Sequence, residues 1–214
     1  MGSGNSARDT VPVYYILSGK EVKRVEPLEL SAALVRDKEL KARVEKNSGV
    51  DVKDCYQCGK CSAGCPMAFA MDYTPRQIIR LLQLGLGQEA LKSHTIWLCA
   101  HCQACYTRCP KEVDLPRLME ALRQEAVRAG LVTEKKVHLF DRAFLSSVER
   151  YGRVHEMGLV VQFNLQSGQP MKDVGLAPSL FFQGKISPLP PRIKDNGAVK
   201  AIFRRVRDRG GAKH

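Results

Sequence analysis

The sequence predicts a mainly α-helical protein with two appended segments, and three observations carry that prediction. Apolar residues recur at helical spacing in several stretches, start and stop signals flank those stretches, and all eight cysteines lie between Cys55 and Cys109. The chain has 214 residues and an apolar content of 44%, which is enough for a buried core. We therefore expect a helical domain at residues 36–151, an N-terminal segment at 1–35 and a basic extension at 152–214.

The N-terminal segment predicts a small β-hairpin. A β-branched and aromatic run at residues 13–17 is followed by Ser-Gly-Lys and by a second short run at 22–25. The first residues lack the apolar core of a secretory signal, and no run of about 20 apolar residues is present that could cross a bilayer. From these features we expect a soluble, cytoplasmic protein.

A largely exposed helix is predicted between residues 31 and 47. Leu34, Leu40 and Val44 lie there among many charged residues, and Gly49 is a suitable stop. The first group of cysteines follows directly.

Three further helices are predicted from their start signals. Thr74 can cap a helix and Pro75 is tolerated at its first position. The apolar face that follows is Ile78, Ile79, Leu81 and Leu82. A second helix is expected from Asp114 to Gly130, and a third from Thr133. The third carries one stripe of Val137, Phe140, Phe144, Val148 and Tyr151. We interpret these stripes as core rather than as cofactor sites.

Beyond Gly152 the helical pattern weakens, because many glycines and prolines divide the chain into short pieces. We therefore expect an irregular extension that ends in an amphipathic helix. Its apolar face is Val199, Ile202, Phe203 and Val206, and its basic residues are Lys200, Arg204, Arg205 and Arg207. The formal net charge of the chain is +12, and eight Lys/Arg against two Asp/Glu follow Pro191.

One cysteine motif occurs twice, with each cysteine recurring 44 positions later. The two copies are Cys55-x2-Cys58-x2-Cys61-x3-Cys65-Pro66 and Cys99-x2-Cys102-x2-Cys105-x3-Cys109-Pro110. Three thiolates on a short, tightly wound segment can hold three iron corners of one cubane, while the fourth cysteine points away. In two-cluster ferredoxins that fourth cysteine binds the other cluster. The pattern therefore predicts two 4Fe-4S clusters.

The same rule predicts which cysteines share a cluster. The first cluster would take Cys55, Cys58, Cys61 and Cys109, and the second would take Cys99, Cys102, Cys105 and Cys65. Pro66 and Pro110 fix the backbone at the end of each ligand segment. Gly59 and Gly64 are expected to let the backbone approach a cluster closely.

Two other interpretations of the cysteines fit their spacing less well. Zinc sites usually bring two separated C-x2-C pairs together and lack triplets with a trailing Cys-Pro, and disulfides do not suit cysteines this crowded. Because the eight cysteines complete two sites, His101 is expected to pack near a cluster rather than to bind it. Tyr56, Trp97 and Tyr106 are expected to shield the clusters. No P-loop, G-x-S-x-G or H-E-x-x-H pattern appears, so we predict no catalytic site in this chain.

With these motifs placed, residues 54–130 resemble the α-helical ferredoxin module. More closely, the chain resembles the C subunit of heterodisulfide reductase. That resemblance depends on the residues Cys-Tyr-Gln-Cys-Gly-Lys-Cys-Ser-Ala-Gly-Cys-Pro at 55–66, on Trp97-Leu98-Cys99, and on the tail from Gly152-Arg153-Val154-His155-Glu156 to Gly184-Lys185. In that family the C subunit relays electrons between a flavin- and cluster-containing A subunit and a cysteine-rich B subunit that cleaves a disulfide. The resemblance thus implies an electron-transfer subunit with A-like and B-like partners.

Two alternatives remain open at this stage. One is the iron-sulfur subunit of a respiratory dehydrogenase for glycerol 3-phosphate, glycolate or succinate. The other, from a different class, is a zinc-stabilised nucleic-acid-binding protein, which the basic tail suggests. We expect no nucleic acid partner, because docking of the tail to an acidic protein surface, or plain solvation, explains the basic charge of the tail better.

Overall fold

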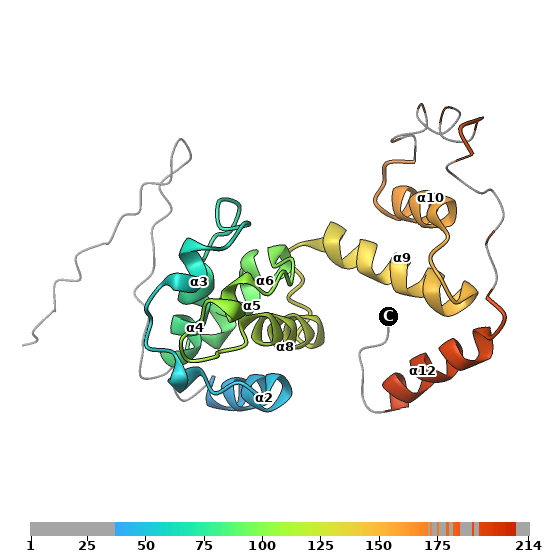
Figure 1. Ribbon diagram of the computed structural model, residues 1–214. Coiled ribbons are helices and arrows are strands. Elements are labelled where there is room, and N and C mark those ends of the chain that lie inside the picture. The colour runs from blue at the N-terminus through green and yellow to red at the C-terminus, as the bar shows by residue number, and fades with distance from the viewer. Residues whose placement is uncertain are drawn as a thin grey trace, which may run out of the picture.

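The structure is a computed structural model that describes residues 37–170, 172, 175, 179, 182–184, 190 and 193–208. Within these residues all regular structure is helical, which confirms the predicted fold class (Figure 1). The hairpin expected in the first 35 residues lies outside the described residues. In the described part of the chain, no helix is both long enough and apolar enough to span a bilayer.

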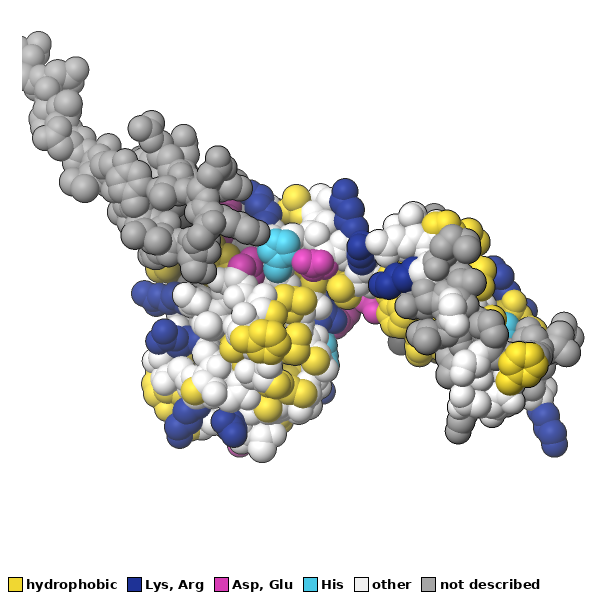
Figure 2. All heavy atoms as spheres, turned by 90° about the horizontal axis from the view of Figure 1, so that it is seen from above, with side chains coloured by type: hydrophobic (Ala, Val, Ile, Leu, Met, Phe, Trp, Pro, Cys, Tyr) yellow, Lys and Arg dark blue, Asp and Glu magenta, His cyan; other side chains and the backbone are white. Residues whose placement is uncertain are grey.

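The helices form two groups. The first lobe comprises α2 (Lys38–Ser48), the short helix η1 (Val52–Asp54), α3 (Lys60–Ala63), α4 (Pro75–Gln83), α5 (Gly87–Lys92), α6 (Thr95–Leu98), α7 (Ala104–Thr107) and α8 (Leu115–Arg128). The second lobe comprises α9 (Lys135–Tyr151), α10 (Glu156–Gln166) and α12 (Asn196–Asp208). Figure 1 shows α9 leading away from the first lobe, with α10 and α12 on either side of it. Seen from above, Lys and Arg side chains are spread over both lobes (Figure 2).

The first lobe is built around α4 and α8, whose predicted start signals are confirmed. At the start of α4, the backbone N–H of Thr74 donates to Gln77 Oε1 at 2.8 Å. At the start of α8, Asp114 Oδ1 accepts from the backbone N–H of Arg117 at 3.1 Å. The large, fully buried side chains that these helices contribute are Ile78, Ile79, Leu82, Leu115, Leu118, Met119 and Leu122. These helices therefore form the frame on which the cysteine segments lie.

A buried carboxylate joins α8 to α2. Glu125 is only 4% exposed and accepts hydrogen bonds from Arg43 Nε at 3.1 Å, Arg128 Nη1 at 2.5 Å and Asn47 Nδ2 at 3.4 Å. A buried charge requires such partners, because an unpaired carboxylate loses its hydration without compensation. This group fixes α2 against the core, and α2 leads through Gly49 (φ 70°) into the first cysteine segment.

The stripe on α9 is less buried than we expected. Phe140 and Phe144 are 44% and 40% exposed, and only Ala143 and Ser147 on this helix are buried. The expectation that the whole stripe is core was therefore wrong. The Phe163 ring of α10 packs edge-on against Phe140, with the ring centroids 5.7 Å apart. Burial of the stripe is partial: α10 and α12 pack against α9, and Phe144 borders a cavity that α9 shares with Trp97 and α8.

Helix α9 also begins later than expected. It starts at Lys135 with Glu134 before it, whereas Thr133 uses its hydroxyl to donate to the Lys92 carbonyl at 2.9 Å. The Thr133 hydroxyl thus binds the last residue of α5 instead of capping α9.

The extension after Gly152 is more helical than the sequence indicated. The amphipathic helix predicted near its end is α12, which is held to α9 by an ion pair of 2.8 Å between Arg207 and Glu149. Helix α10 was not expected. It starts after His155, whose Nδ1 accepts from the backbone N–H of Gly158 at 3.2 Å.

Candidate metal centres

The two cysteine segments share one backbone plan. Gln57 (φ 65°) and Gly59 (φ 83°) are left-handed in the first segment, and His101 (φ 51°) and Gln103 (φ 64°) are left-handed at the corresponding places in the second. A one-turn helix follows in each case, α3 or α7, and carries the third cysteine. Left-handed backbone is costly for residues other than glycine, so its repetition shows that the surrounding structure imposes it. The sequence repeat is therefore also a structural repeat.

The two segments lie against each other. Helices α3 and α7 are in contact. Gly64 and Arg108 occupy the same position of each motif, just before the fourth cysteine, and a Cβ atom on Gly64 would lie only 2.8 Å from Cζ of Arg108. Gly64 is thus a glycine that makes room for Arg108. This contact brings the Cys65 and Cys109 ends of the motifs together, as a crossed ligand arrangement requires.

Four cysteines from both motifs line one cavity. They are Cys65 from the first segment and Cys99, Cys102 and Cys105 from the second. The remaining wall is mostly apolar and consists of Pro66, Met67, Met71, Pro75, Ala100, Ala104, Leu115, Pro116 and Met119. Thiol donors in an apolar surround fit a 4Fe-4S cluster, whose potential depends on burial and on hydrogen bonds to sulfur. All eight cysteines of the chain are free thiols, so none is consumed in a disulfide.

Three cysteines of the other predicted set lie near Tyr56, a side chain that is 58% exposed. The pKa of the Tyr56 hydroxyl is raised, first because the group loses hydration. The hydrogen bond with Cys58 and the negative charge of Cys58 raise it further. The thiolate charges of Cys109 and Cys55 add to that effect. One phenol thus lies close to thiols from both motifs, and these are members of the set Cys55, Cys58, Cys61 and Cys109. No described residues gather three or more His, Cys, Asp or Glu side chains tightly enough for a single ion. A cubane instead requires one thiolate at each of its iron corners.

The thiols differ in how readily they ionise without a metal. Burial raises the pKa of Cys61 and Cys99, and raises that of Cys105 to about 12. The exposed Cys58 behaves oppositely, because the backbone N–H of Lys60 donates to its sulfur and lowers its pKa. The buried thiolates therefore need a cation beside them, which iron would supply.

Hydrogen bonds also reach the sulfurs of Cys55 and Cys109 in the first predicted set. Gln57 Nε2 donates to Cys55 Sγ at 3.5 Å, and the backbone N–H of Val113 donates to Cys109 Sγ at 3.3 Å. Gln83 Nε2 donates to the carbonyls of Val52 and Cys55, both at 2.8 Å, and so holds this segment on α4. Sequence analysis missed both glutamines, since each lies among ordinary polar residues.

Two charged residues that sequence analysis missed hold the second segment. Asp72, in the loop after Cys65, accepts from Thr95 Oγ1 at 2.7 Å and from the backbone N–H groups of Thr95 and His94 at 2.9 Å each. Burial opposes ionisation of Asp72, but these hydrogen bonds outweigh it and hold its pKa below the ordinary value. Arg123 of α8 donates to the carbonyls of Ile96, Trp97 and Cys99.

The aromatic residues near the motifs differ in burial. Tyr56 and Tyr106 are 58% and 41% exposed, and their shielding of the clusters stays a prediction. Trp97 is buried in the core, with its ring 5.8 Å from that of His138. His101 lies with Nε2 3.7 Å from Glu120 Oε2, and burial lowers its pKa.

Comparison with known families identifies the class of this site. Residues 51–113 match the model of the 4Fe-4S dicluster domain, a stretch that contains all eight cysteines. The fold, the paired cysteine sets and this match define a two-cluster iron-sulfur protein.

Within that class, the chain is similar to the C subunits of heterodisulfide reductases. One relative is the C subunit of the H2:CoB-CoM heterodisulfide, ferredoxin reductase of Methanothermobacter marburgensis. The two are 35% identical over 96 residues, which cover 45% of this chain and 52% of that protein. Another is the iron-sulfur C subunit of the CoB-CoM heterodisulfide reductase of Methanopyrus kandleri, which is 34% identical over 132 residues, covering 62% and 63%. The chain thus spans between half and two thirds of these relatives. The resemblance predicted from the cysteine motifs is confirmed.

Proposed function

We propose that this chain is the electron-transfer subunit of a heterodisulfide reductase-type complex. In this role it passes electrons through two 4Fe-4S clusters, between a flavin- and cluster-containing A-like subunit and a cysteine-rich, disulfide-reducing B-like subunit. Cys55, Cys58, Cys61 and Cys109 hold the first cluster, and Cys99, Cys102, Cys105 and Cys65 hold the second.

The observation that carries this proposal is the shared cavity. Cys65 of the first motif lines it beside Cys99, Cys102 and Cys105 of the second, and the Arg108 side chain lies close against Gly64. Segments that exchange ligands keep two clusters close, and sequential electron transfer depends on that closeness. The similarity to the C subunits of heterodisulfide reductases supports the kind of complex.

The test begins with anaerobic reconstitution of the full chain. We expect about eight iron and eight sulfide per chain, with visible absorption that bleaches on dithionite. Zinc without iron would instead support the zinc-stabilised alternative. Isolation of the complex from its native host should then yield a cysteine-rich disulfide reductase subunit. Co-purification with a flavoprotein dehydrogenase, and no such subunit, would favour the respiratory alternative.

A further inference from the structure

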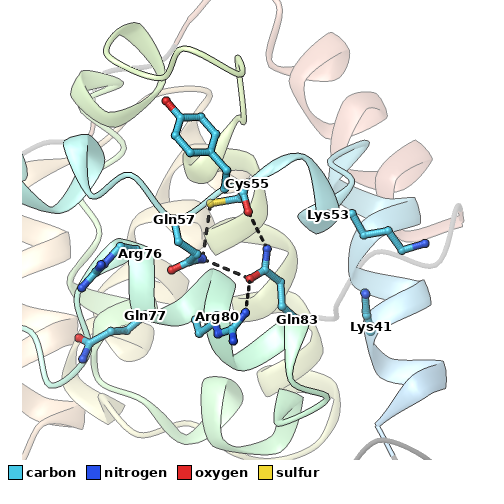
Figure 3. Close-up of a pocket in the computed structure, with 9 residues that line it drawn as sticks. Lys41, Lys53, Cys55, Gln57, Arg76, Gln77, Arg80 and Gln83 are labelled. Carbon is cyan, nitrogen blue, oxygen red and sulfur yellow. Dashed lines mark hydrogen bonds between the residues drawn. The ribbon is translucent and has the colours of Figure 1, made fainter.

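A basic groove of about 830 Å3 lies beside the first cysteine segment. Its cations come from three separate elements: Lys41 from α2, Lys53 from η1, and Arg76 and Arg80 from α4. Figure 3 shows the two arginines on one side and the two lysines on the other, with Cys55 between them. Among the described residues, no acidic side chain lines the groove.

The charge of this groove is largely uncompensated. Lys41 lies 3.9 Å from Glu45, but no carboxylate of the described chain pairs with Lys53, Arg76 or Arg80. Within the described residues, the partner of Arg80 is neutral, Gln83 Oε1 at 3.3 Å. Like charges that converge without counterions repel one another, so a complementary anionic surface stabilises them.

The floor of the groove leads directly to a cysteine of the first predicted cluster. Gln57 bridges the two, because its Nε2 atom lies 3.5 Å from Cys55 Sγ and 3.4 Å from Gln83 Oε1 (Figure 3). Gln83 in turn holds the Cys55 carbonyl at 2.8 Å. A partner in the groove would therefore contact the residues that surround a ligand of the first cluster.

We propose that this groove docks an acidic surface of the redox subunit that exchanges electrons with the first cluster; this rests on the relay function proposed above. The groove fits a protein surface better than a small anion, because its cations are mostly exposed and spread over three elements. Small ligands are typically enclosed on most sides by converging groups. Electrostatic complementarity at such a surface sets the rate and orientation of association.

The test uses the reconstituted full chain and the A-like and B-like subunits of its native complex, each prepared separately. The double variant Lys53→Glu/Arg76→Glu reverses two groove charges whose side chains make no hydrogen bond in the described structure. The matched control, Arg204→Glu/Arg205→Glu, makes the same charge change on α12. We expect the groove variant to bind one of the two subunits about tenfold more weakly at low salt, with the difference shrinking as salt rises. The control should change that binding less than about twofold.

Three outcomes would overturn the docking proposal. The groove variant could bind both subunits like the wild type, the control could weaken binding equally, or the wild-type groove could bind triphosphate stoichiometrically and lose it in the variant. The last result would make the groove a small-anion site. Iron content and dithionite bleaching of each variant show that the clusters are intact. If the wild type itself binds neither subunit, the relay function fails, which is distinct from failure of the groove alone.

Discussion

At the scale of single residues, the fourth cysteine of each motif has the most informative position. Cys65 lines the cavity of the second set, although the three cysteines nearest to it in sequence belong to the first set. We therefore expect Cys65→Ser to damage the second cluster more than the first, because the proposed assignment gives this ligand to the second cluster. Electron paramagnetic resonance on the reduced variant measures this. Loss confined to the cluster held by Cys55, Cys58 and Cys61 would contradict the assignment, and Cys61→Ser is the matched variant for the first cluster.

Gln57 is placed to tune the first cluster through its hydrogen bond to Cys55 Sγ. We choose Gln57→Asn as the test, because asparagine tolerates the left-handed backbone at this position and its shorter side chain withdraws the amide. A hydrogen bond to sulfur favours the more negative, reduced cluster. Its loss should lower the reduction potential of the first cluster by about 40 mV, equivalent to about 1 kcal/mol. A redox titration checks this, with Gln124→Ala on α8 as control; an unchanged or raised potential would contradict it.

Asp72 stabilises the protein by joining the loop after Cys65 to α6. We expect Asp72→Asn to lower the free energy of unfolding of the loaded protein by about 1–2 kcal/mol. The folded pKa is depressed, so this stabilisation is fully present above the unfolded pKa of about 3.8 and is lost only as the pH falls through the folded value. The difference between variant and wild type should thus stay constant from pH 8 to pH 5 in thermal unfolding. A difference that shrinks between pH 7 and pH 5 would show a raised pKa instead. Asp141→Asn, exposed on α9, is the control.

At the scale of elements, α9 and α10 stabilise each other through Phe140 and Phe163. We expect Phe163→Ala to weaken this pair by about 2 kcal/mol, less than for a fully buried phenylalanine, because Phe163 is only partly buried. Hydrogen exchange should become faster in α10 while the first lobe and the visible absorption stay unchanged. Leu165→Ala, at a side chain that is 64% exposed, is the control and should leave exchange in α10 nearly unchanged. Equal acceleration in α4 and α8 would show that the lobes unfold together.

The elements that could be predicted well from the sequence are those with local signals. Thr74 and Asp114 predict α4 and α8, because caps act within one turn of the chain. Helix α10 was missed because its apolar residues lie all round it instead of on one face: Leu159, Val160, Val161, Phe163 and Leu165. The stripe of α9 was correctly predicted to be helical but wrongly to be fully buried, since burial depends on what packs against a helix.

In the candidate site, too, local features could be predicted from the sequence and long-range contacts could not. The eight cysteines and their repeat follow from spacing alone, because the ligand segments are local. The roles of Asp72, Gln83 and Arg123 depend on partners far along the chain, such as Thr95 for Asp72 and Cys99 for Arg123. A single sequence carries no local sign of such contacts.

At the scale of the whole molecule, the second lobe contributes no cysteine. A chain shortened after Gly152 removes α10 and α12 but keeps every predicted ligand and the contacts of α9 with the first lobe. We expect it to hold the same iron and sulfide per chain as the full protein after reconstitution. The full-length chain reconstituted in parallel is the control, and loss of half the iron or more would show that the second lobe supports a cluster.

Net charge also belongs to the whole molecule. The formal value of +12 counts the cysteines as neutral, and two oxidised clusters with their thiolates would reduce it to about +8. The loaded protein remains basic, which favours encounter with acidic partners at low ionic strength.

The repeated left-handed positions place different residues at equivalent points of the two ligand segments. Gln57 and Gly59 in one segment correspond to His101 and Gln103 in the other, so the same path of the main chain carries different chemistry. Among these residues, Gln57 is the one whose side chain donates to a cysteine sulfur in the described structure, to Cys55 Sγ at 3.5 Å. The duplicated framework is thus asymmetric around its sulfurs, because a side-chain amide reaches Cys55 in the first segment and the equivalent residue of the second segment is a histidine.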